Sequence, residues 1–201
     1  MCCIATRLRE IELRVKVMMT RRTDKPTTCR LERIVSGGQT GVDRAALDVA
    51  MECGLPYGGW CPRGRLAEDG VIPSRYLLTE ALTASYSNRT ELNVRDSDAT
   101  LIVVHGPLRG GTALTKRQAD KLGRPVLVVD PLIVGTIELA VEWIVERRVK
   151  TLNIAGPRAS SGRGVHSSAT MFLRTLLERL DLKSGRSARR PRNSRARSGA
   201  V

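Results

Sequence analysis

The stretch Ala99-Thr-Leu-Ile-Val-Val104, followed by Gly106-Pro-Leu-Arg-Gly-Gly-Thr112, decides the fold of this 201-residue chain. The first segment is a continuous apolar run whose second half is β-branched, which is typical of a strand covered on both faces. The second segment is a glycine-rich turn, after which a mostly polar helix is expected from Thr112 to Leu122. A buried strand, a turn and a helix in this order form the repeating unit of a parallel sheet.

The same alternation of strands and helices extends on both sides of this stretch. Right-handed connections between such units place helices on both faces of a sheet. The sequence therefore predicts an α/β fold, a Rossmann-like three-layer sandwich with a mainly parallel sheet. We expect strands over residues 33–36, 56–61, 99–104, 125–129 and 151–155, with 99–104 and 125–129 buried. We expect helices over residues 42–53, 112–122, 137–145 and 169–180, and a loop with one helix over 65–95.

The net charge of +14 is concentrated at the two ends of the chain. Residues 1–33 hold 9 basic and 4 acidic residues, and residues 183–201 hold 7 basic and no acidic residues. The body between them is close to neutral, so nucleic-acid binding is not expected except through the basic tail. The sequence divides into a basic, poorly ordered leader over 1–31, a ligand-binding domain over 32–182 and a disordered basic tail over 183–201.

The cysteines and the apolar runs indicate the compartment. Five irregularly spaced cysteines form no metal-ligand pattern and indicate free thiols in a reducing environment. No apolar run reaches the length of a membrane span, and charged residues interrupt the N-terminal region. We therefore expect a cytoplasmic protein without membrane contact. The sequence leaves open whether translation starts at Met1 or at Met18 or Met19.

Three glycine-rich turns are the candidate binding elements. In parallel sheets ligands bind beyond the carboxyl ends of the strands, where helix N-termini present free N–H groups to phosphates. The first turn matches neither the dinucleotide fingerprint nor the P-loop, and its glycines could equally serve the packing of a tight turn. The predicted ligand-binding residues are Gly37, Gly38, Gln39, Thr40, Gly41 and Arg44 in the first turn, Gly110, Gly111, Thr112 and Thr115 in and after the second, Gly156, Arg158 and Ser160 in the third, and Arg63 in the turn after the strand at 56–61.

Polar residues before the central strand form a weaker candidate. Asp96, Ser97 and Asp98 could orient a ligand hydroxyl or a metal, but a strand-entry turn after a helix C-terminus explains them better. His105 lies at a strand end and could reach a pocket. No metal site and no catalytic triad is evident in the sequence.

Several motifs together resemble the molybdenum-cofactor carrier family. The resemblance covers roughly residues 32–180 and implies a Rossmann-like, usually homo-oligomeric domain. It also implies binding of the molybdenum cofactor or a related phosphorylated ligand, without necessarily transforming it. The motifs are Ser36-Gly-Gly-Gln-Thr-Gly-Val-Asp-Arg-Ala-Ala-Leu-Asp48, Gly59-Trp-Cys-Pro-Arg-Gly64, Ala67-Glu-Asp-Gly70, Thr90-Glu-Leu-Asn-Val-Arg-Asp-Ser-Asp98, Gly110-Gly-Thr-Ala-Leu-Thr115 and Leu152-Asn-Ile-Ala-Gly-Pro-Arg-Ala-Ser160.

A more distant resemblance is to the phosphoribohydrolases often labelled lysine decarboxylases. Their first strand-turn-helix unit is similar to Ile154-Ala-Gly-Pro-Arg158 and the helix after it, so the present fold looks circularly permuted relative to those enzymes. Their glycine-rich motif maps onto 107–115, and its catalytic Glu falls on Thr115. The carboxylate that would handle a ribosyl oxocarbenium ion is therefore missing.

These observations favour a binding or carrier protein for a phosphorylated small molecule, either the molybdenum cofactor or a nucleotide. The alternative is a nucleotide-processing hydrolase that uses Asp96 or Asp98 in place of the missing Glu. A third hypothesis, a nucleic-acid-associated sensor, rests on the basic ends alone. The leading hypothesis requires that the turns at Gly38, Gly111 and Gly156 gather at one edge of the sheet and are not filled by the protein's own side chains.

Overall fold

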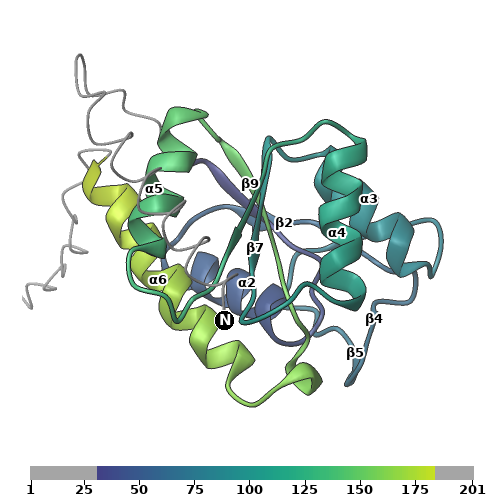
Figure 1. Cartoon of the computed structure of the whole chain (residues 1–201). Coiled ribbons are helices and arrows are strands. Elements are labelled where there is room, and N and C mark those ends of the chain that lie inside the picture. The colour runs from purple at the N-terminus through teal and green to yellow at the C-terminus, as the bar shows by residue number, and fades with distance from the viewer. Residues whose placement is uncertain (1–30, 184–201) are drawn as a thin grey trace, which may run out of the picture.

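The computed structural model describes residues 31–183, and it contains a five-stranded parallel sheet with the strand order β2-β1-β9-β7-β8 (Figure 1). The strands align their apolar residues, so that Ile34 of β1 lies beside Leu152 of β9, and Leu101 of β7 beside Ile154. The strands are β1 (Arg33–Val35), β2 (Tyr57–Gly58), β7 (Ala99–Val103), β8 (Val126–Val129) and β9 (Thr151–Ala155). The predicted α/β sandwich with a parallel sheet is confirmed.

Five helices cover the two faces of this sheet among the described residues (Figure 1). The connections β1→β2 and β8→β9 run in one direction across the sheet, and β2→β7 and β7→β8 run in the other. Right-handed crossovers therefore place α2, α5 and α6 on one face, where α6 packs against both others, and α3 and α4 together on the opposite face. The helices are α2 (Val42–Glu52), α3 (Tyr86–Arg95), α4 (Gly110–Lys121), α5 (Thr136–Glu146) and α6 (Val165–Lys183).

The main core lies between the sheet and the α2, α5 and α6 layer. Small residues of α2, such as Ala45 and Ala46, belong to the same buried cluster as Leu173 and Leu176 of α6, and their small size allows the two helices to pack closely. The strands contribute fully buried leucines and isoleucines to the same cluster. Burial of this apolar surface stabilises the sheet and holds the strand ends in place.

The predicted strand over 56–61 is two strands in separate sheets. β2 pairs with β1 in the main sheet, whereas β3 (Trp60–Cys61) pairs with β6 (Thr79–Glu80). Gly59 separates them with a φ of +134°, and a Cβ at this position would overlap the carbonyl oxygen of Ser36. The apolar run therefore continues while the backbone changes direction, which only glycine permits here.

Two further expectations differ from the structure. Strand 125–129 was expected to be buried, but β8 is an edge strand, and Val128 is 38% exposed. The region 65–95 contains, besides α3, the small antiparallel hairpin of β4 (Leu66–Ala67) and β5 (Gly70–Val71). Strands of two residues are too short to show an alternating pattern.

The predicted leader and tail, apart from Leu31 and Lys183, lie outside the described residues. No helix in the described range 31–183 is long and apolar enough to cross a membrane.

Candidate ligand-binding site

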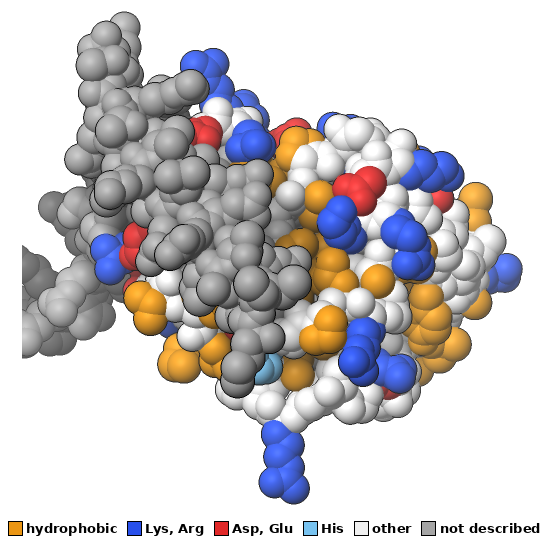
Figure 2. Space-filling model, in the orientation of Figure 1, with side chains coloured by type: hydrophobic (Ala, Val, Ile, Leu, Met, Phe, Trp, Pro, Cys, Tyr) orange, Lys and Arg blue, Asp and Glu red, His pale blue; other side chains and the backbone are white. Residues whose placement is uncertain are grey.

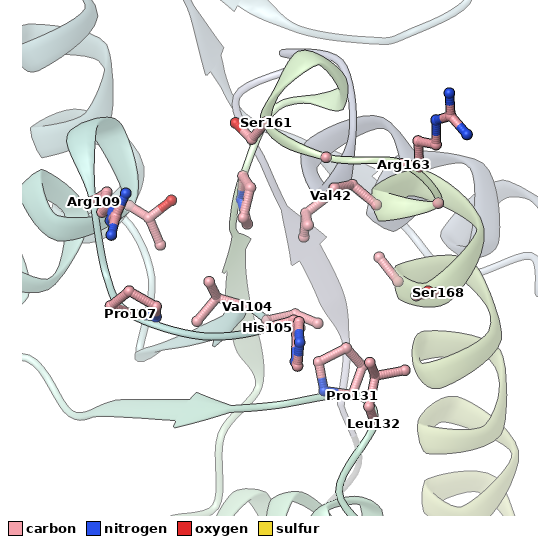
Figure 3. Close-up of a pocket in the computed structure, with 17 residues that line it drawn as sticks. Val42, Val104, His105, Pro107, Arg109, Pro131, Leu132, Ser161, Arg163 and Ser168 are labelled. Atoms are coloured by element: carbon pink, nitrogen blue, oxygen red, sulfur yellow. The ribbon is translucent and has the colours of Figure 1, made fainter.

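A pocket of about 480 Å³ lies at the carboxyl ends of β7, β8 and β9 (Figure 3). Its lining comes from the start of α2, from the end of β7 and the turn after it (103–105, 107, 109 and 112), from Pro131 and Leu132 after β8, and from residues 157, 161–165, 168 and 169 after β9. The helix that follows β7 packs on one face of the sheet, and the helix that follows β9 packs on the other. The strand connections therefore change from one face to the other between these two neighbouring strands. Parallel sheets bind ligands at such switch points, in pockets of about 300–1,000 Å³.

The lining of this pocket is apolar and basic. Val104, Pro131 and Leu132 supply apolar surface, while Arg109 and Arg163 supply charge. Figure 3 shows the two arginines on opposite sides of the pocket, with the Arg163 guanidinium directed away from its centre. None of the described residues that line the pocket is Asp or Glu. The lining therefore favours an anionic ligand with an apolar body.

Two helix starts border the pocket. Helix α4 begins at Gly110, and its N-cap residue Arg109 makes no side-chain capping hydrogen bond. Helix α6 begins at Val165, and residues 162–165 line the pocket. A Cβ at Gly111 would meet no atom within 4 Å, so the space beside this turn is open. The first N–H groups of each helix lack intrahelical partners and favour an anion in front of them.

His105 lies at the pocket with a fixed ring orientation. Its Nδ1 atom is 2.8 Å from Oδ2 of Asp130, and the N–H of Leu132 donates to the other oxygen of this carboxylate. Nε2 is then the ring nitrogen available to a ligand in the pocket.

The first glycine turn is closed by the protein's own side chains. A Cβ at Gly37 would overlap the guanidinium of Arg89, and one at Gly38 would overlap the side chain of Leu78. Arg44 binds Asp69 through two hydrogen bonds of 2.5 and 2.8 Å and also donates to the carbonyl of Gly38. These glycines therefore serve close packing, which is one of the two roles that the sequence left open.

The polar residues of the first and third turns converge on the carboxylate of Glu68. Thr40 donates its hydroxyl proton to Oε1, and the N–H of Ser160 donates to the same oxygen at 3.1 Å. The Ser160 hydroxyl donates to Oε2 at 2.5 Å, and Nε of Arg158 lies 3.3 Å from Oε2. Gln39 accepts the backbone N–H of Glu68. Three residues predicted to bind a ligand anion thus bind a carboxylate of this chain.

These contacts set the charge state of the hairpin carboxylates. Desolvation acts to raise the pKa of Glu68, but hydrogen bonds from Ser160 and Thr40, with the charge of Arg158, lower it below its ordinary value overall. The hydrogen bonds and charge of Arg44 lower the pKa of Asp69. Both carboxylates are therefore ionised at neutral pH.

The three turns meet at one edge of the sheet, as the leading hypothesis required, but side chains of the protein fill the turns at Gly38 and Gly156, which the hypothesis excluded. A Cβ at Gly156 would overlap the carbonyl oxygen of Val103 and the side chain of Val42, and one at Gly41 would overlap the carbonyl of Pro157. The first and third turns therefore pack directly against each other. Only the second turn, at Gly110 and Gly111, faces open space.

The remaining predicted residues lie away from the pocket. Asp98 accepts the N–H groups of Lys150 and Thr151 at the amino ends of the strands. Ser97 donates to the carbonyl of Asn93, and Asp96 accepts from the ring N–H of Trp60. Asp98 therefore joins elements at the amino edge of the sheet, whereas Ser97 and Asp96 hold the end of α3 to its own turn and to β3. None of the three lines the pocket, so the structure does not support the suggested ligand contact there. Thr115 is buried and donates to the carbonyl of Gly111, and Arg63 is exposed outside the pocket lining.

Two groups of residues at this edge were not predicted from the sequence. Glu68 and Asp69 lie in a stretch whose sequence predicts a loop, so nothing in the pattern assigns them a contact. Arg109 and Arg163 flank glycines in the second turn and before α6, which is the signal that could have marked them. Figure 2 shows that Lys and Arg side chains outnumber acidic ones on the face over α4, which favours the approach of anions. No cluster of three or more potential metal-ligating side chains occurs within residues 31–183.

Comparisons with known proteins agree with this arrangement. The model of the Circularly permutated YpsA SLOG family matches residues 34–177. The chain is also similar to the crystal structure of a protein from Syntrophus aciditrophicus named "Putative molybdenum carrier protein", with 46% sequence identity and a TM-score of 0.70. This match covers 77% of the present chain and 98% of that chain. No curated protein matches the chain.

Proposed function

Since the chain belongs to the circularly permutated YpsA SLOG family, we propose that it binds and carries a phosphorylated small molecule, the molybdenum cofactor, in the pocket beside α4. The observation that carries this proposal is the open, basic and acid-free lining of the pocket next to the start of a helix. The name of the solved relative, a molybdenum carrier protein, supports the choice of ligand. Homo-oligomerisation stays a prediction.

The residues of the pocket fit a phosphorylated ring compound. The phosphate would lie before the N–H groups of Gly110 and Gly111, where Arg109 can reach it. The body of the ligand would lie against Val104 and Leu132, with Nε2 of His105 at its polar edge. The metal would arrive as part of this ligand, and the pocket residues would bind and orient the organic part and limit its contact with water.

Binding without turnover is favoured over hydrolysis. Thr115 stands where the related hydrolases have their catalytic Glu, and its hydroxyl is already bonded to the carbonyl of Gly111. Asp96 and Asp98, which the hydrolase hypothesis used instead, are bound to Trp60 and to the backbone of Lys150, and neither lines the pocket. The pocket therefore offers cations and N–H groups to an anion but no carboxylate to activate water.

The test is a titration of the full chain with molybdenum cofactor released from a molybdoenzyme, and with a nucleoside monophosphate. The variant Gly111→Asp places a carboxylate at the helix start, where it is compatible with helix stability but repels a phosphate. We expect saturable binding by the wild type and a loss of at least about tenfold in the variant. Lys116→Ala, in the same helix and outside the pocket, is the control. Absence of saturable binding, or equal binding by Gly111→Asp, contradicts the proposal.

A further inference from the structure

The cradle around Glu68 has the composition of an oxyanion site. Its donors are the hydroxyls of Thr40 and Ser160, the N–H of Ser160 and the guanidinium of Arg158. The N–H of Ala159 also points at this site and donates to Oγ1 of Thr40 at 3.1 Å. Hydroxyls, backbone N–H groups and a guanidinium are the groups that bind phosphate in proteins. The negative group that they hold here is supplied by the chain itself.

The segment that supplies this carboxylate is weakly anchored elsewhere. Glu68 lies at the tip of the β4–β5 hairpin, whose exposed Leu66 and Val71 bury little apolar surface. Gly64 and Gly70 flank the tip at φ values of +80° and +108°. Besides the carboxylate of Glu68, the tip is tied to the body by the pair of Asp69 with Arg44 and by the N–H of Glu68, which donates to the side chain of Gln39. Ala67 of the hairpin also packs against the smaller core cluster. Displacement of Glu68 would therefore leave most of the core unchanged.

The cradle adjoins the pocket but is separate from it. Pro157 and Ser161, on either side of the cradle segment 158–160, both line the pocket, whereas Glu68 and Thr40 do not. Figure 3 shows Ser161 on the loop that precedes α6, at the margin of the pocket. An anion in the cradle would thus lie next to a ligand in the pocket without sharing the start of α4.

We propose that this cradle is a second oxyanion-binding site, which Glu68 fills in the free protein and which a phosphate group takes over as the hairpin moves away. The inference goes beyond the proposed function, because it concerns residues outside the pocket and applies to inorganic phosphate itself. A phosphate presents three or four oxygens to the donors that now share the two oxygens of one carboxylate. The low pKa of Glu68 is consistent with donors arranged for a negative charge.

The expected behaviour follows from competition. An intramolecular carboxylate that occupies the site lowers the apparent phosphate affinity by the fraction of time in which the site is free. Removal of the carboxylate removes this competition and one repelling charge. We therefore expect Glu68→Ala to bind phosphate at least about tenfold more tightly than the wild type.

The experiment is a phosphate titration of the full chain at neutral pH. The matched control is Glu52→Ala, which removes one surface carboxylate paired with Arg174 and should change phosphate affinity less than twofold. Adding Thr40→Val and Ser160→Ala to Glu68→Ala should abolish the gain, whereas adding Gly111→Asp should preserve it. Equal affinity of Glu68→Ala and wild type, or a gain that survives loss of Thr40 and Ser160, overturns the proposal.

A measurement on the wild type keeps the test independent of variant folding. Amide hydrogen exchange of residues 64–72 should become faster when phosphate is added, because the hairpin leaves the body. Unchanged or slower exchange at a phosphate concentration that saturates binding overturns the proposal. Failure of the proposed function would instead appear at Gly111→Asp with the organic ligand, so the two results are separate.

Discussion

The first and the second glycine turns look alike in the sequence and differ in the structure. The turn at Gly37, Gly38 and Gly41 is packed against Arg89, Leu78 and the backbone after Pro157. At Gly110 and Gly111 an added Cβ would meet no atom within 4 Å, and the turn borders a pocket of about 480 Å³. The difference teaches that glycine at a strand end has two uses, close packing within the protein and access for a ligand.

The largest expected effect is the loss of stability on filling the closed turn. Gly41 has φ +75° and ψ −126°, a conformation that other residues rarely adopt, and its Cβ would overlap the backbone of residues 157–159. Backbone strain and overpacking each cost about 1–3 kcal/mol, so Gly41→Ala should lower the free energy of unfolding by about 4 kcal/mol. Urea denaturation measures this loss. A change below about 1 kcal/mol would show that the turns are not packed as described.

The fold could be predicted because its signals are local. The apolar run at 99–104 and the spacing of small and apolar residues in 42–53 each place one element, and the order of elements then determines a parallel sheet. The contacts of a glycine are not local. Gly37 is closed by Arg89 and Gly156 by Val103, and no pattern around either glycine identifies these partners.

The candidate site could be predicted only in part, because some of its signals are local and others depend on contacts between distant residues. The gathering of three turns at one edge follows from the parallel order of the strands. Glu68 fills the cradle because the β4–β5 hairpin folds back onto the first and third turns. Hydrophobic periodicity does not predict where a hairpin of two-residue strands folds back. Asp98 illustrates the opposite error, because a polar residue before a strand lies at the amino edge, where it binds Lys150 and Thr151 rather than a ligand.

The next largest effect is the loss of stability expected at Asp98, which lies at the amino edge of the sheet and not at the pocket. Asp98→Ala removes the two hydrogen bonds that the backbone N–H groups of Lys150 and Thr151 donate to the exposed side chain of Asp98. We expect a loss of about 1.5 kcal/mol in the free energy of unfolding and no change in ligand affinity. Chemical denaturation and a ligand titration of the same preparation measure both values. Weaker ligand binding at unchanged stability would return Asp98 to the candidate site.

A smaller effect concerns the pH dependence of the closed cradle. The pKa values of Glu68 and Asp69 are lowered in the folded protein, so the docked hairpin is stabilised above the ordinary carboxyl pKa values and loses this contribution as the pH falls through the folded-state values. Because these are near-surface groups, the total should stay below about 1 kcal/mol. Chemical shifts of the hairpin amides, followed from pH 7 down to about pH 3, measure the release. The Glu68→Ala variant should lose the part of the change that belongs to Glu68.

The smallest effect on stability belongs to the open turn, and it is a gain. Gly111 lies in the first turn of α4, and its added Cβ would enter open space, so Gly111→Ala should raise the free energy of unfolding by about 0.5 kcal/mol through the lower entropy of the unfolded chain. The same methyl group would stand where a phosphate approaches the helix N–H groups, so ligand affinity should fall. Stability and binding then change in opposite directions at Gly111, whereas at Gly41 the main change is a loss of stability. If Gly111→Ala destabilised the protein as Gly41→Ala does, the two turns would share one packing role, and the pocket would lose its strongest structural support.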